Sequence, residues 1–195
     1  MEKRRCDWAL GHSLMQAYHD KEWGVPIHDD RKLFELLILE GMQAGLSWLT
    51  ILKKRDTFRQ AFDGFDPGKI ARYRQARVER LMKDKGIIRN RLKIESTISN
   101  ARSCLSVQKE LGGFSDYLWG LLEGHTTDTI YRRMRDIPAQ TPAAVSMSKA
   151  LKKRGFRFVG PTICYAFMQA TGMVNDHLPT CFRYKEVRRT RGRRK

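Results

Sequence analysis

The amino-acid sequence predicts an all-α fold, and two observations carry this prediction. Apolar residues recur at the three- and four-residue spacing of amphipathic helices along most of the chain, and the two-residue alternation of half-buried strands is nearly absent. Since 41% of the 195 residues are hydrophobic and 10% are aromatic, the chain can bury a substantial core. Without a repeat or a linker, residues 1–182 are expected to form a single domain, with two intimately packed helical lobes as the alternative.

The first predicted helix begins at Asp29-Asp30, which supplies an N-cap and an acidic first turn. Its apolar run extends from Leu33 to Leu52 and is expected to stop at the basic residues 53–55. Gly41 and Gly45 interrupt the run, so we expect the helix to bend or split there.

The later helices are marked by capping, proline or glycine signals. They begin at Asp66-Pro67, near Val78 (ending before Gly86), at Asn90 (ending at Leu111), at Ser115 (running through Leu122), at Thr141-Pro142 (closed by Gly155) and at Thr162 (running to Ala170). The stretches from 125 to 140 and after 176 show no such pattern and are expected to be irregular.

The chain is strongly basic, with 38 Lys and Arg against 21 Asp and Glu and a net charge of +17. This surplus favours a polyanionic partner, usually nucleic acid, over a soluble protein that is merely basic. Residues 183–195 hold eight basic residues and one acidic residue, so +7 lies in what we expect to be a disordered basic tail and +10 in the remainder.

Two classes of protein, membrane-spanning and secreted, are excluded by the distribution of apolar residues. No stretch approaches the roughly 18 apolar residues of a membrane span, so we expect no membrane partner. The opening residues 1–5 lead to no apolar run and do not form a secretory signal. We therefore expect a cytoplasmic protein, in which structural disulfides are rare.

Two cysteines have a histidine partner, in the patterns Cys6-x12-His19 and His177-x3-Cys181. Zinc is held by such nitrogen and sulfur ligands, and a site built from both chain ends would tie the termini together. Spacing alone is a weak signal here, and by itself it favours the alternative of an exposed cysteine, a surface histidine and an ordinary loop.

The segment 154–162 lies between two predicted helices and is expected to form a short apolar hairpin, with Gly155 and Gly160 where the backbone must come close to something. The free amides that open the following helix are donors for anions, which suits a DNA phosphate with Lys152 and Lys153 beside it. A plain helix–helix turn capped by Gly155 explains the pattern about as well.

Glu40 places a carboxylate inside an apolar run. Burying an unpaired carboxylate is costly, so this side chain either has partners, faces a cavity, or lies on the solvent face of its helix. Tyr18, Trp23 and Trp48 are aromatics that belong either to the core or to the walls of a pocket that stacks a flat ligand.

Over about residues 6–182, the sequence resembles the 3-methyladenine DNA glycosylase I family. This family belongs to the helix-hairpin-helix glycosylase superfamily. The resemblance is carried by segments spread over the chain: Ala17–Asp20, Glu22–Pro26, Leu39–Trp48, Leu52–Arg55, Gly86–Arg89, Ser148–Phe156, Phe158–Ala170 and Val174–His177. The basic tail matches no motif of this family.

The resemblance implies a zinc site that joins the chain ends. Its ligands fall on Cys6, His19, His177 and Cys181. Four protein ligands leave no open position, so the implied zinc is structural. Asp7 departs from the glycine common at this position in the family, and we do not expect it to disturb the site.

The resemblance also implies an activity and the residues that perform it. The expected enzyme is a monomeric, monofunctional DNA-repair glycosylase that flips 3-methyladenine out of alkylated double-stranded DNA and hydrolyses its N-glycosidic bond. The base-reading carboxylate falls on Glu40. The remaining implied roles are the aromatic pocket (Tyr18, Trp48 and the nearby Trp23), the wedge (Gly45, Leu46) and the phosphate contacts (Lys153, Gly160, Thr162).

Three alternatives to this function differ from it in the residues that they require. Asp176 is a second catalytic candidate, although it follows Gly160 by only 16 residues, a shorter gap than that role usually has. A strand-cutting lyase with an iron–sulfur cluster would need closely spaced cysteines, which this chain lacks. A DNA-binding module without activity would not need Glu40 amid the aromatic set.

Overall fold

The computed structural model describes residues 3–125, 127 and 129–191, and over these residues it is helical without strands, which confirms the all-α prediction. No helix in this part of the chain is long and apolar enough to cross a membrane. The elements are η1 (Asp7–Ala9), α1 (Ser13–Lys21), α2 (Asp30–Gln43), α3 (Trp48–Ala61), η2 (Asp63–Phe65), α4 (Pro67–Ile70), α5 (Gln75–Lys83), α6 (Arg91–Leu111), α7 (Phe114–Gly120), η3 (Met134–Asp136), α8 (Pro142–Lys153), α9 (Pro161–Ala170) and α10 (Phe182–Arg191).

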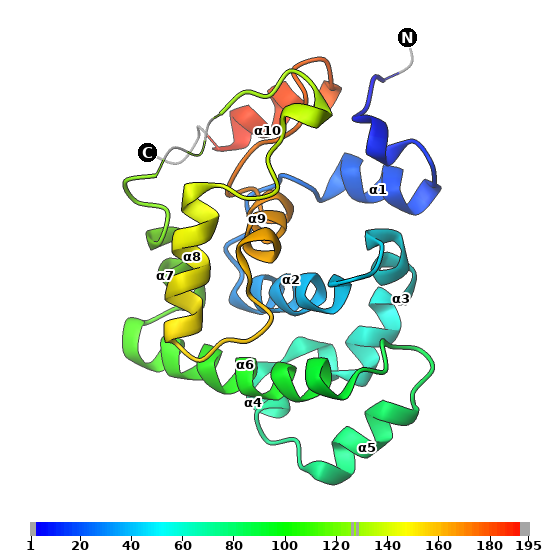
Figure 1. Ribbon diagram of the computed structural model, residues 1–195, viewed down its shortest axis with the longest axis vertical. Helices are drawn as coiled ribbons and strands as arrows, with labels where there is room; N and C mark the ends of the chain where they lie inside the picture. The colour runs from blue at the N-terminus through cyan, green and yellow to red at the C-terminus, as the bar shows by residue number, and fades with distance from the viewer. Residues whose placement is uncertain (1–2, 126, 128, 192–195) are drawn as a thin grey trace.

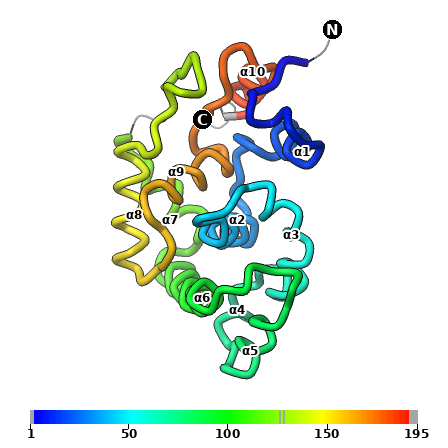
Figure 2. Tube along the Cα trace, turned by 45° about the vertical axis from the view of Figure 1, so that its right-hand side comes forward, coloured from blue at the N-terminus to red at the C-terminus, as the bar shows by residue number. Residues whose placement is uncertain are grey.

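Helix α2 lies at the centre of the molecule, with α6 below it, α3 on one side, α7 and α8 on the other, and α1 and α10 above (Figures 1 and 2). Its residues 36–42 are all buried, because a helix that is apolar on every side must be enclosed by other elements. The main core surrounds this helix. A second, smaller cluster of buried residues gathers near the chain ends: Cys6, Tyr18, Trp23, Leu52, Ala170, Leu178 and Cys181.

The expected interruption near Gly41 and Gly45 is confirmed as a split between α2 and α3. Gly45 lies in the connecting turn with φ of 81°, a left-handed conformation that favours glycine. Ser47 caps α3 by accepting the Thr50 N–H at 3.2 Å. The prediction that the helix stops at residues 53–55 is wrong, since α3 continues to Ala61. Phe58 and Ala61 extend its buried face, while Lys53 is exposed and Lys54 and Arg55 are half-buried.

The helices predicted between residues 66 and 170 are all present, with ends shifted by no more than a few residues. In α6 the Asn90 side chain accepts the Lys93 N–H at 3.1 Å, and Gly112 ends the helix with φ of 85°. The irregular stretch 125–140 contains only the short η3 among its described residues. Helix α1 was not predicted, because only Tyr18 and His19 of its residues are buried and no apolar stripe marks it.

The expectation of a disordered tail is wrong for residues 183–191, which belong to α10. One apolar side chain explains the difference: Val187 is buried and lies beside Gly24. Asn175 Nδ2 also donates to the Tyr184 carbonyl at 3.1 Å, and Arg183 pairs with Glu186 at 2.7 Å. These contacts hold α10 in place, although its composition by itself is typical of a solvated, disordered segment. Residues 192–195 of the expected tail lie outside the described residues.

Candidate functional site

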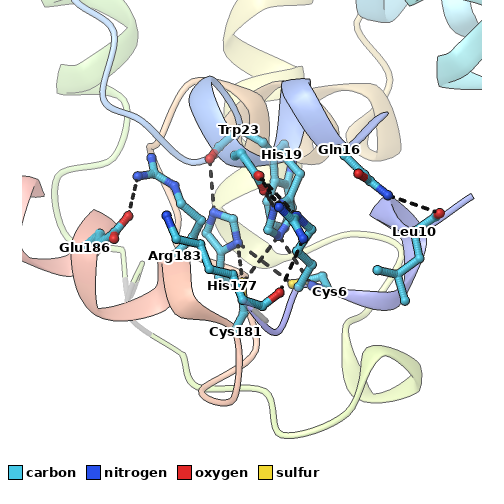
Figure 3. A network of polar contacts seen from close by, with 12 residues as sticks. Cys6, Leu10, Gln16, His19, Trp23, His177, Cys181, Arg183 and Glu186 are labelled. Carbon is cyan, nitrogen blue, oxygen red and sulfur yellow. Dashed lines mark hydrogen bonds and ion pairs between the residues drawn. The ribbon is translucent and has the colours of Figure 1, made fainter. Parts of the chain in front are cut away.

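Four buried metal-ligating side chains meet where the two ends of the chain come together (Figure 3). Cys6 precedes η1, His19 lies on α1, and His177 and Cys181 lie on the connection from α9 to α10. Their ligand atoms all lie within 4.8 Å of one another. The structure therefore joins two patterns that the sequence spacing left unconnected, and the alternative of an exposed cysteine and a surface histidine is wrong.

Three sulfur–nitrogen separations in this cluster are close to those around a tetrahedral metal ion. The Cys181 sulfur lies 3.4 Å from His19 Nε2 and 3.7 Å from His177 Nδ1, and the Cys6 sulfur lies 3.8 Å from His177 Nδ1. With metal–sulfur bonds of about 2.3 Å and metal–nitrogen bonds of about 2.0 Å, tetrahedral geometry places sulfur and nitrogen about 3.5 Å apart. This donor set can hold one metal ion with no position left open.

The other nitrogen of each imidazole is held by a fixed partner. Asp20 Oδ1 lies 2.8 Å from His19 Nδ1, and the Trp23 carbonyl oxygen lies 3.1 Å from His177 Nε2. Arg5 in turn donates to Asp20 at 2.8 Å. Such partners set the imidazole tautomer and leave His19 Nε2 and His177 Nδ1 with their lone pairs toward the cluster, as in structural metal sites.

The two thiols of the cluster are electrostatically unequal. The hydrogen bond from the Cys6 thiol lowers the pKa of Cys181 below its usual range. The contact with Cys181, together with burial, raises the pKa of Cys6. The contact between the two sulfurs thus favours the thiolate form at Cys181, and thiolate is the form that binds metal ions.

An aromatic group borders the cluster and continues to α3. The rings of Tyr18 and Trp48 have centroids 5.3 Å apart, and Trp23 packs edge-on against His177 at 4.5 Å. Trp8, which the sequence analysis did not select, lies 5.0 Å from Trp23 and 6.3 Å from Tyr18. Its position two residues after Cys6 was the one available signal. The Trp48 Nε1–H is buried without a hydrogen-bond partner in the described part of the chain.

Glu40 lies on α2 with only 4% of its surface exposed, so the solvent-face alternative is wrong. No hydrogen bond or ion pair joins its carboxylate to any part of the chain that the structure describes, and burial raises its pKa to about 8. Burial, then the charges of Glu40 and Glu22, raise the pKa of Tyr18, which places both carboxylates near that ring. An unpaired buried carboxylate and an unpaired indole N–H are costly, and such groups are typical of a site kept for a ligand.

A salt bridge missed by the sequence analysis supports the aromatic group. Arg55 of α3 donates to both carboxylate oxygens of Glu22, at 2.6 and 2.9 Å. Glu22 directly follows α1, which carries Tyr18, and α3 begins at Trp48. The bidentate pair therefore joins the two helices whose aromatic side chains face each other.

The residues expected to contact DNA lie on two separate connections. Gly45 and Leu46 occupy the turn between α2 and α3, where Leu46 is 41% exposed. Lys153 ends α8, Gly160 is the N-cap of α9, and Thr162 lies in its first turn; Lys153 and Thr162 are exposed. The predicted hairpin is a loop between two helices, and Phe158 within it has φ of 54°.

Asp176 occupies a different environment from Glu40. It accepts hydrogen bonds from the Tyr165 hydroxyl at 2.5 Å and from Gln169 Nε2 at 2.8 Å. Both donors belong to α9, so this carboxylate ties the segment that carries His177 to that helix.

Comparisons with known proteins agree on one family. The sequence model of methyladenine glycosylase matches residues 8–184. The chain is 51% identical over 180 residues to DNA-3-methyladenine glycosylase 1 of Escherichia coli K12, covering 92% of this chain and 96% of the relative. It is 46% identical to DNA-3-methyladenine glycosylase of Haemophilus influenzae, with 91% and 96% covered.

Solved structures give the same result. A crystal structure of 3-methyladenine DNA glycosylase I superposes with a TM-score of 0.88 at 53% identity, covering 92% of this chain and 98% of that one. A Staphylococcus aureus 3-methyladenine DNA glycosylase I, solved to explain recognition of 3-methyladenine, superposes with a TM-score of 0.87 at 36% identity, with 91% and 95% covered.

The buried carboxyl of Glu40 predicts a pH-dependent stability. Its pKa rises from an unfolded value of 4.5 to about 8, so between these pH values the native state holds a proton that the unfolded state has lost. Stability contributed by this group is therefore lost as pH rises through that window. Glu40→Gln is expected to be more thermostable than wild type, with an advantage that grows from pH 5 to pH 8 to the order of a few kcal/mol.

Thermal melts of both proteins across this range measure the effect. Glu123→Gln is the matched control, because Glu123 is exposed and its carboxylate stays in water in both states. If the gain in stability of Glu40→Gln over wild type stayed constant or shrank with rising pH, the argument that burial raises the pKa of Glu40 would be contradicted.

Proposed function

The chain belongs to the methyladenine glycosylase family and is a glycosylase, and from this premise we propose that it releases 3-methyladenine from alkylated double-stranded DNA by hydrolysis of the N-glycosidic bond. The observation that carries the proposal is the unpaired, buried Glu40 carboxylate, whose charge acts on Tyr18, the ring that packs against Trp48. We propose that residues 1–182 form a single catalytic domain that acts as a monomer, and the family match over residues 8–184 supports the single domain.

Recognition follows from the charge of the damaged base. Methylation at N3 makes adenine cationic, and the faces of Tyr18 and Trp48 attract a positive ring. Glu40 accepts hydrogen bonds from the base's Watson–Crick or exocyclic donors, as charged acceptors do strongly. A cation next to Glu40 favours its ionised form, so the base itself converts a carboxyl that burial keeps protonated into a carboxylate.

The base reaches this pocket only after leaving the DNA stack. Leu46, exposed on the turn between α2 and α3, fills the gap that the base leaves. The amides at Gly160 and Thr162, together with the exposed Lys153 at the end of α8, hold a backbone phosphate.

Bond cleavage needs little acid catalysis in this proposal. The methylated base already carries a positive charge, so it leaves with the electron pair of the glycosidic bond and becomes neutral. Water then adds to the sugar carbon and releases a proton. Glu40 contributes by binding the cationic base in place, and Asp176 takes no part because its carboxylate is bonded to Tyr165 and Gln169.

The activity is tested with Glu40→Gln on methylated duplex DNA, with the released bases separated by chromatography. We expect release of 3-methyladenine to fall by about 100-fold or more, because a neutral amide cannot replace a charged acceptor in a dry site. Glu123→Gln is expected to match wild type.

Full activity of Glu40→Gln would contradict the role of this carboxylate. Strand breaks made by wild type without alkali would instead indicate a lyase, and binding to methylated DNA without base release would indicate a recognition module.

We propose further that Cys6, His19, His177 and Cys181 hold a structural zinc ion. The support is the nitrogen and sulfur donor set, three sulfur–nitrogen separations of 3.4 to 3.8 Å within it, and the fixed partner of each imidazole. When bound, the ion supplies a cross-link between residues 171 positions apart in the chain. In this proposal, the ion stabilises the helix-hairpin-helix glycosylase fold by tethering the N- and C-terminal segments.

Metal analysis of protein purified without chelator is expected to find about one zinc per chain. Cys181→Ser is expected to lose the zinc and to melt at a lower temperature, because the closed loop is released. Cys164→Ala is the control, since it alters a buried cysteine outside the cluster and is expected to keep its zinc. Wild-type protein without zinc would refute the site.

Helix α10 lies almost entirely beyond the family match, which ends at residue 184. We propose that its exposed cations Lys185, Arg188 and Arg189 add salt-sensitive affinity for any duplex and leave base selection to the pocket.

Replacing these three residues by glutamine leaves the buried Val187 in place, so the helix is retained. The slope of log affinity against log salt for undamaged duplex is expected to flatten by about 1 to 3. The charge-conserving variant Lys185→Arg, Arg188→Lys, Arg189→Lys is expected to keep the wild-type slope. An unchanged slope in the glutamine variant, or a change in which base is released, would contradict this division of roles.

A further inference from the structure

Lys93 of α6 is a lysine with only 7% of its surface exposed. Its Nζ donates to the Met42 carbonyl at 2.9 Å and to the Ala44 carbonyl at 2.7 Å. These carbonyls lie at the C-terminal end of α2, where backbone acceptors lack partners within the helix and carry partial negative charge. A buried ammonium is costly unless such bonds satisfy it, so this contact holds the turn that follows α2 in one place.

Asn100 of the same helix makes an equally specific contact with the loop between α8 and α9. Its Oδ1 accepts the Arg157 N–H at 2.7 Å, and its Nδ2 donates to the Arg157 carbonyl at 3.0 Å. Asn100 is 2% exposed. One buried side chain therefore satisfies both backbone groups of a residue that lies three positions before Gly160.

The loop and α2 also touch each other directly. A Cβ placed on Gly41 would stand 3.2 Å from the Phe158 Cβ, and Ser148 donates to the Val159 carbonyl at 2.6 Å. The backbone of residues 157–159 is thus held from α6, from α8 and by contact with α2.

Lys93 and Asn100 are seven residues apart, which is about two helical turns or about 10.5 Å along one face of α6. Figure 1 shows α6 running alongside α2, and the two helices are in contact. A continuous helix of this kind is stiff, so it sets the distance between the two backbone segments that these side chains hold.

We infer that Lys93 and Asn100 are positioning residues that fix the spacing between the Gly45–Leu46 turn and the loop before Gly160, so that both engage the same stretch of duplex. The inference rests on the proposed function, and it goes beyond it because neither side chain needs to touch DNA or base. Loss of either contact is therefore expected to weaken binding to duplex DNA and base release from it, and to leave the affinity of the pocket for the free base unchanged.

The experiment compares Lys93→Met with wild type in two assays, release of 3-methyladenine from methylated duplex and binding of free 3-methyladenine measured by tryptophan fluorescence. We expect kcat/KM for release to fall about 10- to 100-fold, since a misplaced contact far from the reacting bond can cost that much. The Kd for the free base is expected to stay unchanged.

A second arm tests whether Lys93 acts through the wedge. In a Leu46→Ala background, Lys93→Met is expected to cause little further loss, because the position of an absent wedge no longer matters. The matched control is Arg102→Met, since Arg102 also lies on α6 and donates to a backbone carbonyl, that of Ala71 at 3.1 Å, but is exposed and away from both segments.

Asn100→Asp keeps the shape of the side chain and turns the donor facing the Arg157 carbonyl into an acceptor, so it tests the inference even where Lys93→Met does not fold. It is expected to weaken binding of undamaged duplex about 10-fold, with free-base binding retained. The inference is overturned if Lys93→Met and Asn100→Asp act on and bind duplex DNA as well as Arg102→Met does. It is also overturned if these variants lose free-base binding in parallel with duplex binding. A third contrary result is a double variant in which the losses of activity caused by Lys93→Met and Leu46→Ala simply add. A wild-type chain that released no 3-methyladenine would contradict the proposed function, and duplex binding by Asn100→Asp would still decide the inference.

Discussion

The burial of helix α2 is the constraint on which the rest of this structure depends. Its apolar side chains point in every direction, so α3, α6, α7 and α9 must pack around it to exclude water. The same packing desolvates Glu40, the one carboxylate on its buried part, and raises the pKa of that group to about 8. A stable core and an electrostatically unusual site are therefore two results of the same burial.

The chain ends contribute a second, smaller core that links metal ligands to aromatic side chains. Cys6 and Cys181 lie in one buried cluster with Tyr18 and Trp23. Trp23 packs edge-on against His177, and its own carbonyl holds the other nitrogen of that imidazole. An ion at the four ligands would thus stabilise the wall of the proposed base pocket as well as join the termini, although it would take no part in bond cleavage.

The helix starts that the sequence predicted correctly are set by contacts between neighbouring residues. Asp29, Asn90 and Thr141 were identified as helix starts, and each accepts a backbone N–H three residues later. Such contacts depend only on neighbouring residues. The extent of α3 beyond residues 53–55 and the existence of α10 were missed, because each depends on a few side chains, such as Phe58 and Val187, that are buried by distant parts of the chain.

The sequence by itself determined the helical class, most helix boundaries, the surplus of positive charge and, through its resemblance to a family, which residues to examine. Tertiary structure alone decided that Cys6 and His177, 171 residues apart, bring their ligand atoms within 3.8 Å. It likewise decided that Glu40 lacks a partner and that Lys93 and Asn100 hold two distant backbone segments. The physical reason is that capping and periodicity act between near neighbours, whereas desolvation, ligand geometry and buried hydrogen bonds depend on groups that only folding brings together.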